Sequence, residues 1–165
     1  ERKIINFCSI LFQSNDYRWL MMANLEIKHT YITVMTQNAG EYYDITDDLI
    51  QFCKECNINT GLMIAYSLHT TTGLVVNEGS DPGVGKDVSE ILWKIVPESR
   101  DWKHTEESPL DSAAHVKAQL IGNSIILGVE MGKIILGEWQ RVYFIEYIEA
   151  RERKVFVMLL GTNYP

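Results

Sequence analysis

Three of the four histidines lie where the surrounding sequence turns polar, and these residues are the best suited to chemistry. His69 follows a short apolar run, His104 lies in a polar stretch, and His115 lies on a short predicted helix. Imidazole is the commonest protein ligand for zinc, and three protein ligands with one open position make a catalytic metal site. The spacing matches no local zinc motif, so the residues alone leave open whether the three side chains converge.

Polar residues after His69 could complete such a site. Glu78 ends an apolar strand beside a glycine-rich loop and could act as a general base. Asp87 is equally well explained as a residue at the start of a helix. Residues 70–73 offer hydroxyl groups and backbone N–H groups that could hold an anion, although threonine-rich turns are common.

The last third of the chain carries further candidates. Gln140 and Glu146 fall in one predicted strand, about 20 Å apart along it, so both can touch one small ion only if the strand bends. Arg151, Arg153 and Lys154 concentrate positive charge in an acidic protein. They form either a solvated turn or a clamp for phosphate or carboxylate, since the guanidinium fork suits bidentate binding of oxyanions.

The three cysteines do not make a disulfide framework. Cys53 and Cys56 form a C-x-x-C pair inside an apolar helical pattern, with no Pro or Gly between them and no second pair. We therefore interpret this pair as residues that pack in the core rather than as a zinc half-site or a redox pair. This cysteine usage predicts a reducing, cytoplasmic location.

Length and composition restrict the class of protein. A chain of 165 residues that is 46% hydrophobic can bury a substantial core in one domain. With 22 acidic against 15 basic residues it carries a net charge of −7, which argues against a nucleic-acid partner. The apolar run at 4–12 is too short to span a bilayer, so we expect no membrane partner and no signal peptide. We predict a peripheral extension at residues 1–22 and a single domain at 23–165.

The sequence predicts both strands and helices as the elements that position these side chains. Alternating and β-branched segments predict strands, and apolar residues at helical spacing predict helices. Strands are expected at 25–36, 61–68, 74–77, 124–129, 133–144 or beyond, and 154–160, and helices at 46–56, 85–96 and from 111 or 112 to 122. Thr46 is the expected N-cap of the first helix. Short turns between the later strands indicate the α+β class.

In combination, these blocks resemble the YjbQ-like family, uncharacterised proteins to which a secondary thiamine-phosphate synthase activity is attributed. The matching segments fall in order between residues 25 and 161. They are SLHTT at 67–71, NE at 77–78, DP at 81–82, Asp87, His104, HVK at 115–117, LIG at 120–122, Gly132, LGEWQ at 136–140, Glu146 and RER at 151–153. The chain departs from the family pattern at Thr72, at Glu138 and in the turn at 148–151, which lacks the usual Gly and Pro.

The resemblance implies a mainly antiparallel β-sheet with two or three flanking helices, assembled as a homotrimer. It also implies a pocket in which His69, His104 and His115 come together around a divalent metal, Zn or Mg. The implied catalytic residues are Glu78, Gln140 and Glu146. The implied residues for binding a phosphorylated small-molecule substrate are Thr70, Thr71, Asn77, Asp87, Lys117, Arg151 and Arg153.

Three functions stay open at this point. The resemblance implies a transferase that joins a pyrimidine methyl diphosphate to a thiazole phosphate and releases diphosphate. The second is a metal-dependent hydrolase of a small phosphorylated or carbonyl substrate, with Glu78 as general base on metal-bound water. The third is a non-catalytic trimeric protein that binds a metal or a small molecule.

Overall fold

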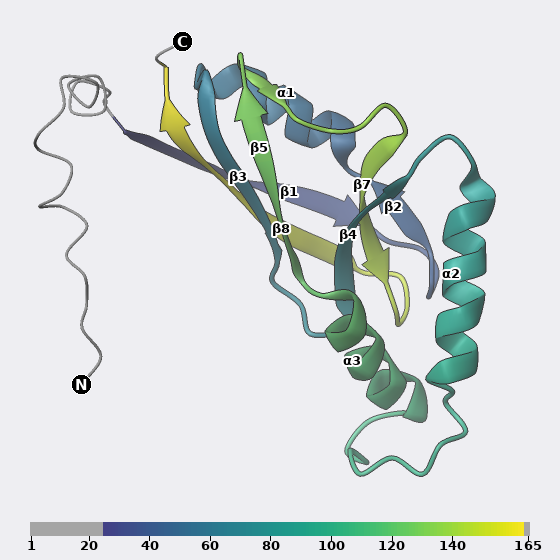
Figure 1. Cartoon of the computed structure of the whole chain (residues 1–165). Coiled ribbons are helices and arrows are strands. Elements are labelled where there is room, and N and C mark those ends of the chain that lie inside the picture. Colours follow the sequence, from purple (N-terminus) through teal and green to yellow (C-terminus); the bar gives the residue numbers. More distant parts are fainter. Residues whose placement is uncertain (1–24, 164–165) are drawn as a thin grey trace, which may run out of the picture.

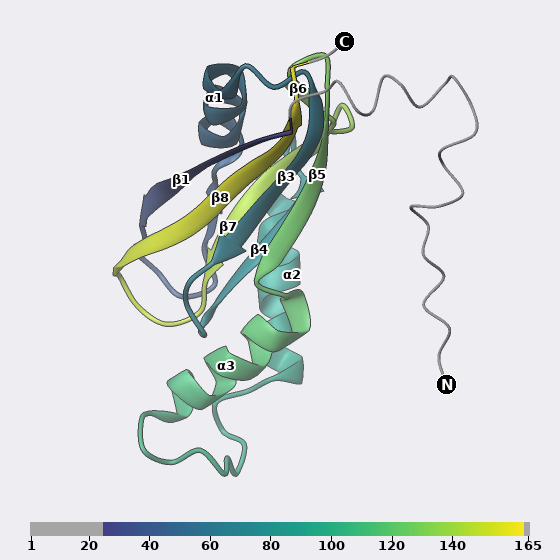
Figure 2. The same cartoon turned by 90° about the vertical axis from the view of Figure 1, so that its left-hand side faces the viewer.

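The computed structural model of the chain describes residues 25–163, which form two antiparallel sheets and three helices (Figures 1 and 2). The larger sheet has the strand order β1 (Glu26–Met35), β8 (Glu152–Thr162), β3 (Thr60–Ser67), β5 (Ser124–Glu130) and β6 (Lys133–Ile134). The smaller sheet has the order β2 (Tyr42–Asp44), β7 (Gln140–Glu146) and β4 (Thr72–Glu78). The helices are α1 (Thr46–Cys56), α2 (Pro82–Ile95) and α3 (Pro109–Ile121). The predicted α+β class with flanking helices is confirmed.

The main core lies between the two sheets and α1. Leu49 of α1, Met63 of β3, Phe144 of β7 and Val157 of β8 are fully buried in it. Alternate residues of each strand supply these side chains, because successive residues of a strand point to opposite faces. Cys53 lies in the same core as a free thiol, together with its C-x-x-C partner, which agrees with the packing interpretation of that pair.

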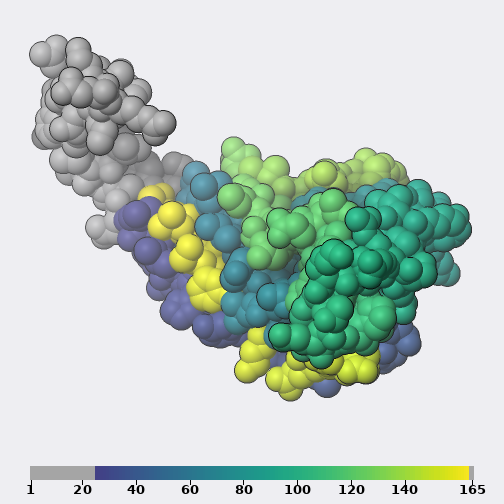
Figure 3. All heavy atoms as spheres, turned by 90° about the horizontal axis from the view of Figure 1, so that it is seen from below, coloured from purple at the N-terminus to yellow at the C-terminus, as the bar shows by residue number. Residues whose placement is uncertain are grey.

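A second apolar cluster joins α2 and α3 to the smaller sheet. Leu92 of α2, Ala114 and Ala118 of α3, and Ile145 of β7 are buried against one another. In Figure 1 α2 stands to the right of the sheets and α3 lies below them, and the segment that connects the two helices runs along the lower end of the molecule. Seen from below, this part of the chain forms a continuous teal-to-green surface (Figure 3).

The strand predicted at 133–144 is wrong, because two strands of different sheets occupy this stretch. β6 pairs with β5 in the larger sheet, whereas β7 pairs with β2 and β4 in the smaller one. A turn carries the chain between them. In it, the Gln140 backbone N–H donates to the Gly137 carbonyl at 3.0 Å, and the Gly137 N–H donates to the Gln140 side chain at 2.8 Å.

Two helices begin earlier than predicted, because a proline occupies their first turn. Asp81 is the N-cap of α2 and accepts a hydrogen bond from the Gly83 N–H at 2.7 Å. Ser108 is the N-cap of α3 and accepts from the Asp111 N–H at 3.2 Å. Proline suits the first helical position, since that position needs no N–H donor. The early start of α3 places Asp111 in its first turn.

The first helix also differs from prediction at its N-terminus. Thr46 is its first residue rather than its N-cap, and the Thr46 N–H donates to the Asp44 carboxylate at 2.8 Å. The predicted extension at 1–22 lies outside the described residues. Between residues 25 and 163, no helix combines the length and the hydropathy needed to cross a membrane.

Candidate functional site

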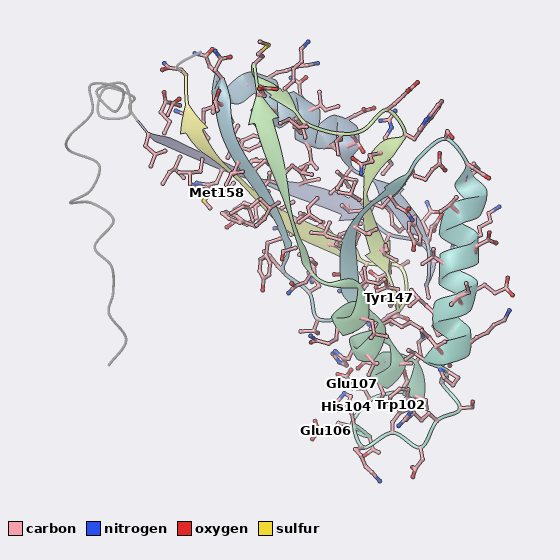
Figure 4. All side chains as sticks on the ribbon, in the orientation of Figure 1. Trp102, His104, Glu106, Glu107, Tyr147 and Met158 are labelled. Carbon is pink, nitrogen blue, oxygen red and sulfur yellow. The ribbon has the colours of Figure 1, made fainter. Side chains whose placement is uncertain are left out.

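Two histidines and two carboxylates converge at the start of α3. Potential ligand atoms of His104, Glu107, Asp111 and His115 all lie within 4.8 Å of one another, and we call this group the α3 cluster. The Asp111 Oδ2 atom lies 3.0 Å from His115 Nε2 and 3.5 Å from His104 Nε2. Figure 4 shows His104 and Glu107 beside the lower end of α3. Two imidazoles and two carboxylates are a donor set that suits zinc and similar ions.

Local structure around the start of α3 positions three members of the α3 cluster. Ser108 starts the helix, so Asp111 and His115 fall four residues apart on one helical face. The Ser112 hydroxyl donates to the His104 carbonyl at 2.8 Å, which holds the preceding loop against the helix. The Thr70 carbonyl lies 3.2 Å from His115 Nδ1 and orients that ring.

The contact between His115 Nε2 and Asp111 Oδ2 joins two acceptor atoms whenever the imidazole ring is neutral. Because a carbonyl oxygen can only accept, His115 Nδ1 must be the donor to Thr70, and a neutral ring then presents a lone pair at Nε2. That lone pair faces the Asp111 Oδ2 atom, which is buried and has no hydrogen-bond donor among residues 25–163. Two acceptors at 3.0 Å need a proton or a metal ion to bring them together. The α3 cluster therefore has the features of a cation site.

The two carboxylates of the α3 cluster perturb one another. Burial tends to raise the pKa of Asp111, but the hydrogen bond with Glu107 and the charges of His115 and His104 lower it overall. The pKa of Glu107 is raised, because its carboxyl group hydrogen-bonds the Asp111 carboxylate and lies in its negative field. Adjacent carboxylates that cannot both ionise readily are common where a cation binds.

The His69 side chain forms its hydrogen bond outside the α3 cluster. Its Nε2 atom accepts a hydrogen bond from the Lys154 backbone N–H at 2.8 Å, so only Nδ1 is free. Burial lowers the pKa of His69, and the nearby charge of Arg153 lowers it further. His69 is not part of the α3 cluster, although it lines a hollow of about 330 Å³ together with His115 and Thr70. The arrangement thus brings together two of the three predicted histidines, with two carboxylates that were not predicted.

Glu146 and Arg153 form a buried ion pair. The carboxylate oxygens lie 2.6 Å from Arg153 Nε and 2.8 Å from its Nη2 atom. One oxygen also accepts the backbone N–H groups of Tyr147 and Ile148, each at 3.1 Å. Arg153 Nη2 reaches the Thr71 hydroxyl at 3.3 Å. These contacts give Glu146, Arg153 and Thr71 partners within the protein, and the catalytic and anion-binding roles that the resemblance implies for them stay predictions.

Glu78 and Asn77 lie at a different hollow. They line a space of about 490 Å³ between α2 and the smaller sheet, and no member of the α3 cluster borders it. The Glu78 carboxylate accepts from the hydroxyl and N–H of Ser80 and from the Asp81 N–H, and these bonds lower its pKa. Gln140 pairs with Glu78 across the sheet. Neither residue belongs to the α3 cluster, and the catalytic roles predicted for Glu78 and Gln140 stay predictions.

Lys117 is buried between α3 and α2. Its Nζ atom lies 3.1 Å from the centroid of the Trp93 ring and has no hydrogen-bond partner among the described residues. Burial lowers the pKa of Lys117 to about 8. Because this ammonium is fully covered, it is not accessible to an anion in solution. Asp87 is exposed on α2 and lines none of the hollows described above.

Arg151 is a predicted anion-binding residue whose side chain is exposed. Its Nη2 atom lies 2.7 Å from Glu149 Oε1 in an exposed pair. That hydrogen bond is the main cause of a raised pKa of Arg151, and the charge of Asp111 contributes to it.

Sequence reasoning missed Glu107 and Asp111. A signal for Asp111 was available, because an acid and a histidine four residues apart share one face of a helix. It required Ser108 and Pro109 to be interpreted as the start of α3, since only then does Asp111 belong to the helix.

Comparisons with known proteins agree with this fold. Residues 30–162 match the model of a family described as UPF0047 protein YjbQ-like. A UPF0047 protein of Archaeoglobus fulgidus is 41% identical over 129 residues, which cover 78% of this chain and 98% of that protein. The UPF0047 protein YugU of Bacillus subtilis is 34% identical over 86% of this chain and all of its own length.

Solved structures show the same similarity. A YbjQ-like protein of unknown function from Sulfolobus solfataricus superposes with a TM-score of 0.78 at 26% identity, and covers 84% of this chain and 99% of its own. An uncharacterised YjbQ/UPF0047 protein from Clostridium acetobutylicum superposes with a TM-score of 0.74 at 37% identity, over 79% of this chain and 98% of its own.

Proposed function

The chain belongs to the YjbQ-like UPF0047 family, and we propose that it is a metal-dependent enzyme that acts on a small phosphorylated substrate. One observation carries the proposal, namely the buried Asp111 oxygen that lies 3.0 Å from His115 Nε2 and has no hydrogen-bond partner among residues 25–163. A bound cation satisfies both atoms at once. Zinc fits these ligands better than magnesium, because magnesium prefers an all-oxygen set.

The residues of this chain have separable roles in that site. His104, His115 and Asp111 would hold the ion, and the Thr70 carbonyl would fix the orientation of His115 as an outer-shell partner. A bound ion would supply positive charge to polarise a phosphoryl oxygen and to neutralise the leaving group. Arg151 adds a second positive charge near the cluster for the phosphate oxygens.

The surroundings of His115 favour group transfer over hydrolysis. His115 borders two hollows, one of about 680 Å³ that also includes His104, and one of about 330 Å³ that includes His69. A reaction that joins two molecules needs both of them held close to the same centre. This supports a transferase that joins a pyrimidine methyl diphosphate to a thiazole phosphate and releases diphosphate. Hydrolysis of one small phosphorylated or carbonyl compound, which needs only one hollow, is the second candidate.

An apolar sheet face supports assembly into a homotrimer as part of the proposal. On the larger sheet, Ile27, Tyr31, Leu62 and Ile126 are each about half exposed or more, between 49% and 66%. Large exposed apolar patches mark protein interfaces. A reducing, cytoplasmic location completes the proposal, since Cys53 and its partner are free thiols.

Turnover of the two thiamine precursors tests the proposal. Metal-free protein is reloaded with Zn²⁺ or Mg²⁺, and product and diphosphate are measured with both substrates and with each one alone. We expect product from the wild type and from Asp87→Asn, an exposed acid on α2, but not from Asp111→Asn. Phosphate release from one substrate alone would instead favour the hydrolase. Metal binding without turnover of any substrate would leave a binding protein and refute the enzyme.

A further inference from the structure

The proposed reaction does not use the hollow between α2 and the smaller sheet. This hollow measures about 490 Å³, which falls within the range of pockets that hold small molecules, about 300 to 1,000 Å³. Figure 1 shows α2 beside β2, β4 and β7, and residues from all four elements line the hollow. None of its lining residues belongs to the α3 cluster, so a molecule bound here occupies a second site.

Two tyrosines form adjoining walls of this hollow. The ring centroids of Tyr42 and Tyr143 lie 5.7 Å apart, and the ring planes are inclined at 65°. Both side chains are half-buried, so part of each ring is open to a ligand. Aromatic faces attract a positive charge, and two inclined rings can contact the same cation.

Negative charge predominates around these rings. The carboxylates that line the hollow are those of Glu41, Glu78, Asp81 and Glu90. Glu90 is paired with Lys94 at 2.5 Å, and Lys86 is the one basic residue in the wall among those that the structure describes. The other three carboxylates outweigh this single ammonium group, so the hollow has a negative potential that attracts cations.

The loop before α2 is not suited to an anion, because its N–H groups already have carboxylate acceptors. The Glu78 carboxylate accepts the backbone N–H groups of Ser80 at 2.7 Å and of Asp81 at 2.9 Å. The Asp81 carboxylate in turn accepts the Gly83 N–H at 2.7 Å. The hydrogen bond from the Ser80 hydroxyl is the main cause of a lowered pKa of Glu78, so this carboxylate stays ionised at neutral pH.

The hollow is not suited to a metal ion either. Between residues 25 and 163, three or more histidine, cysteine or carboxylate ligand atoms converge only at the α3 cluster. A bound metal ion needs several such atoms at about 2.0 to 2.6 Å from one centre. A positive charge spread over methyl groups needs no such convergence, because ring faces and the field of nearby carboxylates attract it.

We propose that this hollow is a second binding site, which takes a small quaternary ammonium cation. The cationic group lies against the rings of Tyr42 and Tyr143. The carboxylates of Glu41 and Glu78 supply the negative field that holds it. Binding at this site is independent of the metal and of the proposed function.

Calorimetric titration of the full chain with two matched probes tests this assignment. Choline and 3,3-dimethylbutan-1-ol have nearly the same shape, but only choline carries a positive charge. We expect choline to bind about tenfold more tightly than the neutral alcohol, because two ring contacts together supply about that factor. Higher salt should weaken the binding of choline alone, since salt screens charges near the surface. Equal affinity for the two probes would overturn the proposal.

Two substitutions at Tyr143 separate the ring from the hydroxyl group. Tyr143→Leu should reduce the preference for choline to about threefold, because one ring is lost. Tyr143→Phe keeps the ring and should keep the affinity for choline within about twofold. A Tyr143→Leu protein that retained the full preference would show that this ring does not bind the cation, and would overturn the assignment.

A third substitution tests the carboxylate field. Glu78→Gln should weaken choline about threefold and leave the affinity for the neutral alcohol unchanged, since only choline interacts with the charge. Tyr66→Leu and Glu138→Gln are the controls, because they change an exposed tyrosine and an exposed acid outside the hollow. Neither control should alter the affinity for either probe, and a loss of choline binding in both would place the cation elsewhere.

Two further measurements test whether the site is separate and takes a free molecule. Choline binding should persist after the metal is stripped with a chelator, because no residue of the α3 cluster lines the hollow. Loss of choline binding together with the metal would contradict a second site. Phosphatidylcholine vesicles carry the same cation on a lipid, and protein that sediments with them but binds no free choline would overturn the assignment to a small molecule.

Discussion

Replacing Glu146 with Gln tests whether this carboxylate supports the fold or takes part in chemistry. Glu146 is fully buried, and its oxygens lie 2.6 and 2.8 Å from two nitrogens of Arg153. The substitution removes the charge that compensates the guanidinium and places an amide group where Arg153 now donates. Breaking one partner of a buried ion pair destabilises a protein by about 3 to 5 kcal/mol. We therefore expect the free energy of unfolding to fall by about that amount.

Urea denaturation followed by circular dichroism measures this loss. Glu90→Gln is the matched control, because it breaks an exposed pair with Lys94 and should leave the free energy of unfolding nearly unchanged. A double variant with Met at both Glu146 and Arg153 should recover part of the loss, since no unpaired buried charge remains. If Glu146→Gln unfolded at the same urea concentration as the wild type, the structural role assigned to this pair would be refuted.

Two further predictions concern α3. The pKa of Lys117 is lowered from 10.5 to about 8, so the unfolded chain binds its proton more tightly than the folded chain. The free energy of unfolding should therefore rise by about 2.5 kcal/mol from pH 8 to pH 10.5 relative to Lys117→Met, as denaturation at several pH values will reveal. An equal slope in both proteins would contradict this. Ser108→Ala removes the N-cap of α3 and should lower stability by about 1 kcal/mol and weaken metal binding at Asp111, whereas a fully retained metal affinity would argue against positioning by the cap.

The spacing of apolar residues within a segment correctly predicted several strands and helices. The alternating segment at 25–36 is β1, and the apolar helical pattern at 46–56 is α1, because one face of each element packs against the core. The turn at Gly137 was missed, because the chain leaves the larger sheet after β6, and β7 then pairs with β4, more than 60 residues earlier in the chain. Such long-range pairing leaves no local signature.

Only part of the candidate site could be predicted, because some of its contacts join residues that are far apart in the sequence. His104 and His115 were identified as polar side chains in a loop and on a helix, and they meet in the α3 cluster. His69 has the same residue type, but its partner is a backbone N–H 85 residues away, which the sequence cannot reveal. Glu78 likewise bonds to its own loop. The residue types suggested the chemistry of the site, but only the folded structure shows which residues lie next to one another.

Metal content of the purified chain and three variants tests the central claim most directly. Elemental analysis should find about one zinc-type ion per wild-type chain. We expect this ion to be lost in Asp111→Asn and in His115→Ala, which remove the two atoms that face each other at 3.0 Å. It should be retained in His69→Gln, because His69 Nε2 already accepts the Lys154 N–H. A wild-type chain that binds no metal, or an ion that stays in Asp111→Asn and leaves in His69→Gln, would contradict the account.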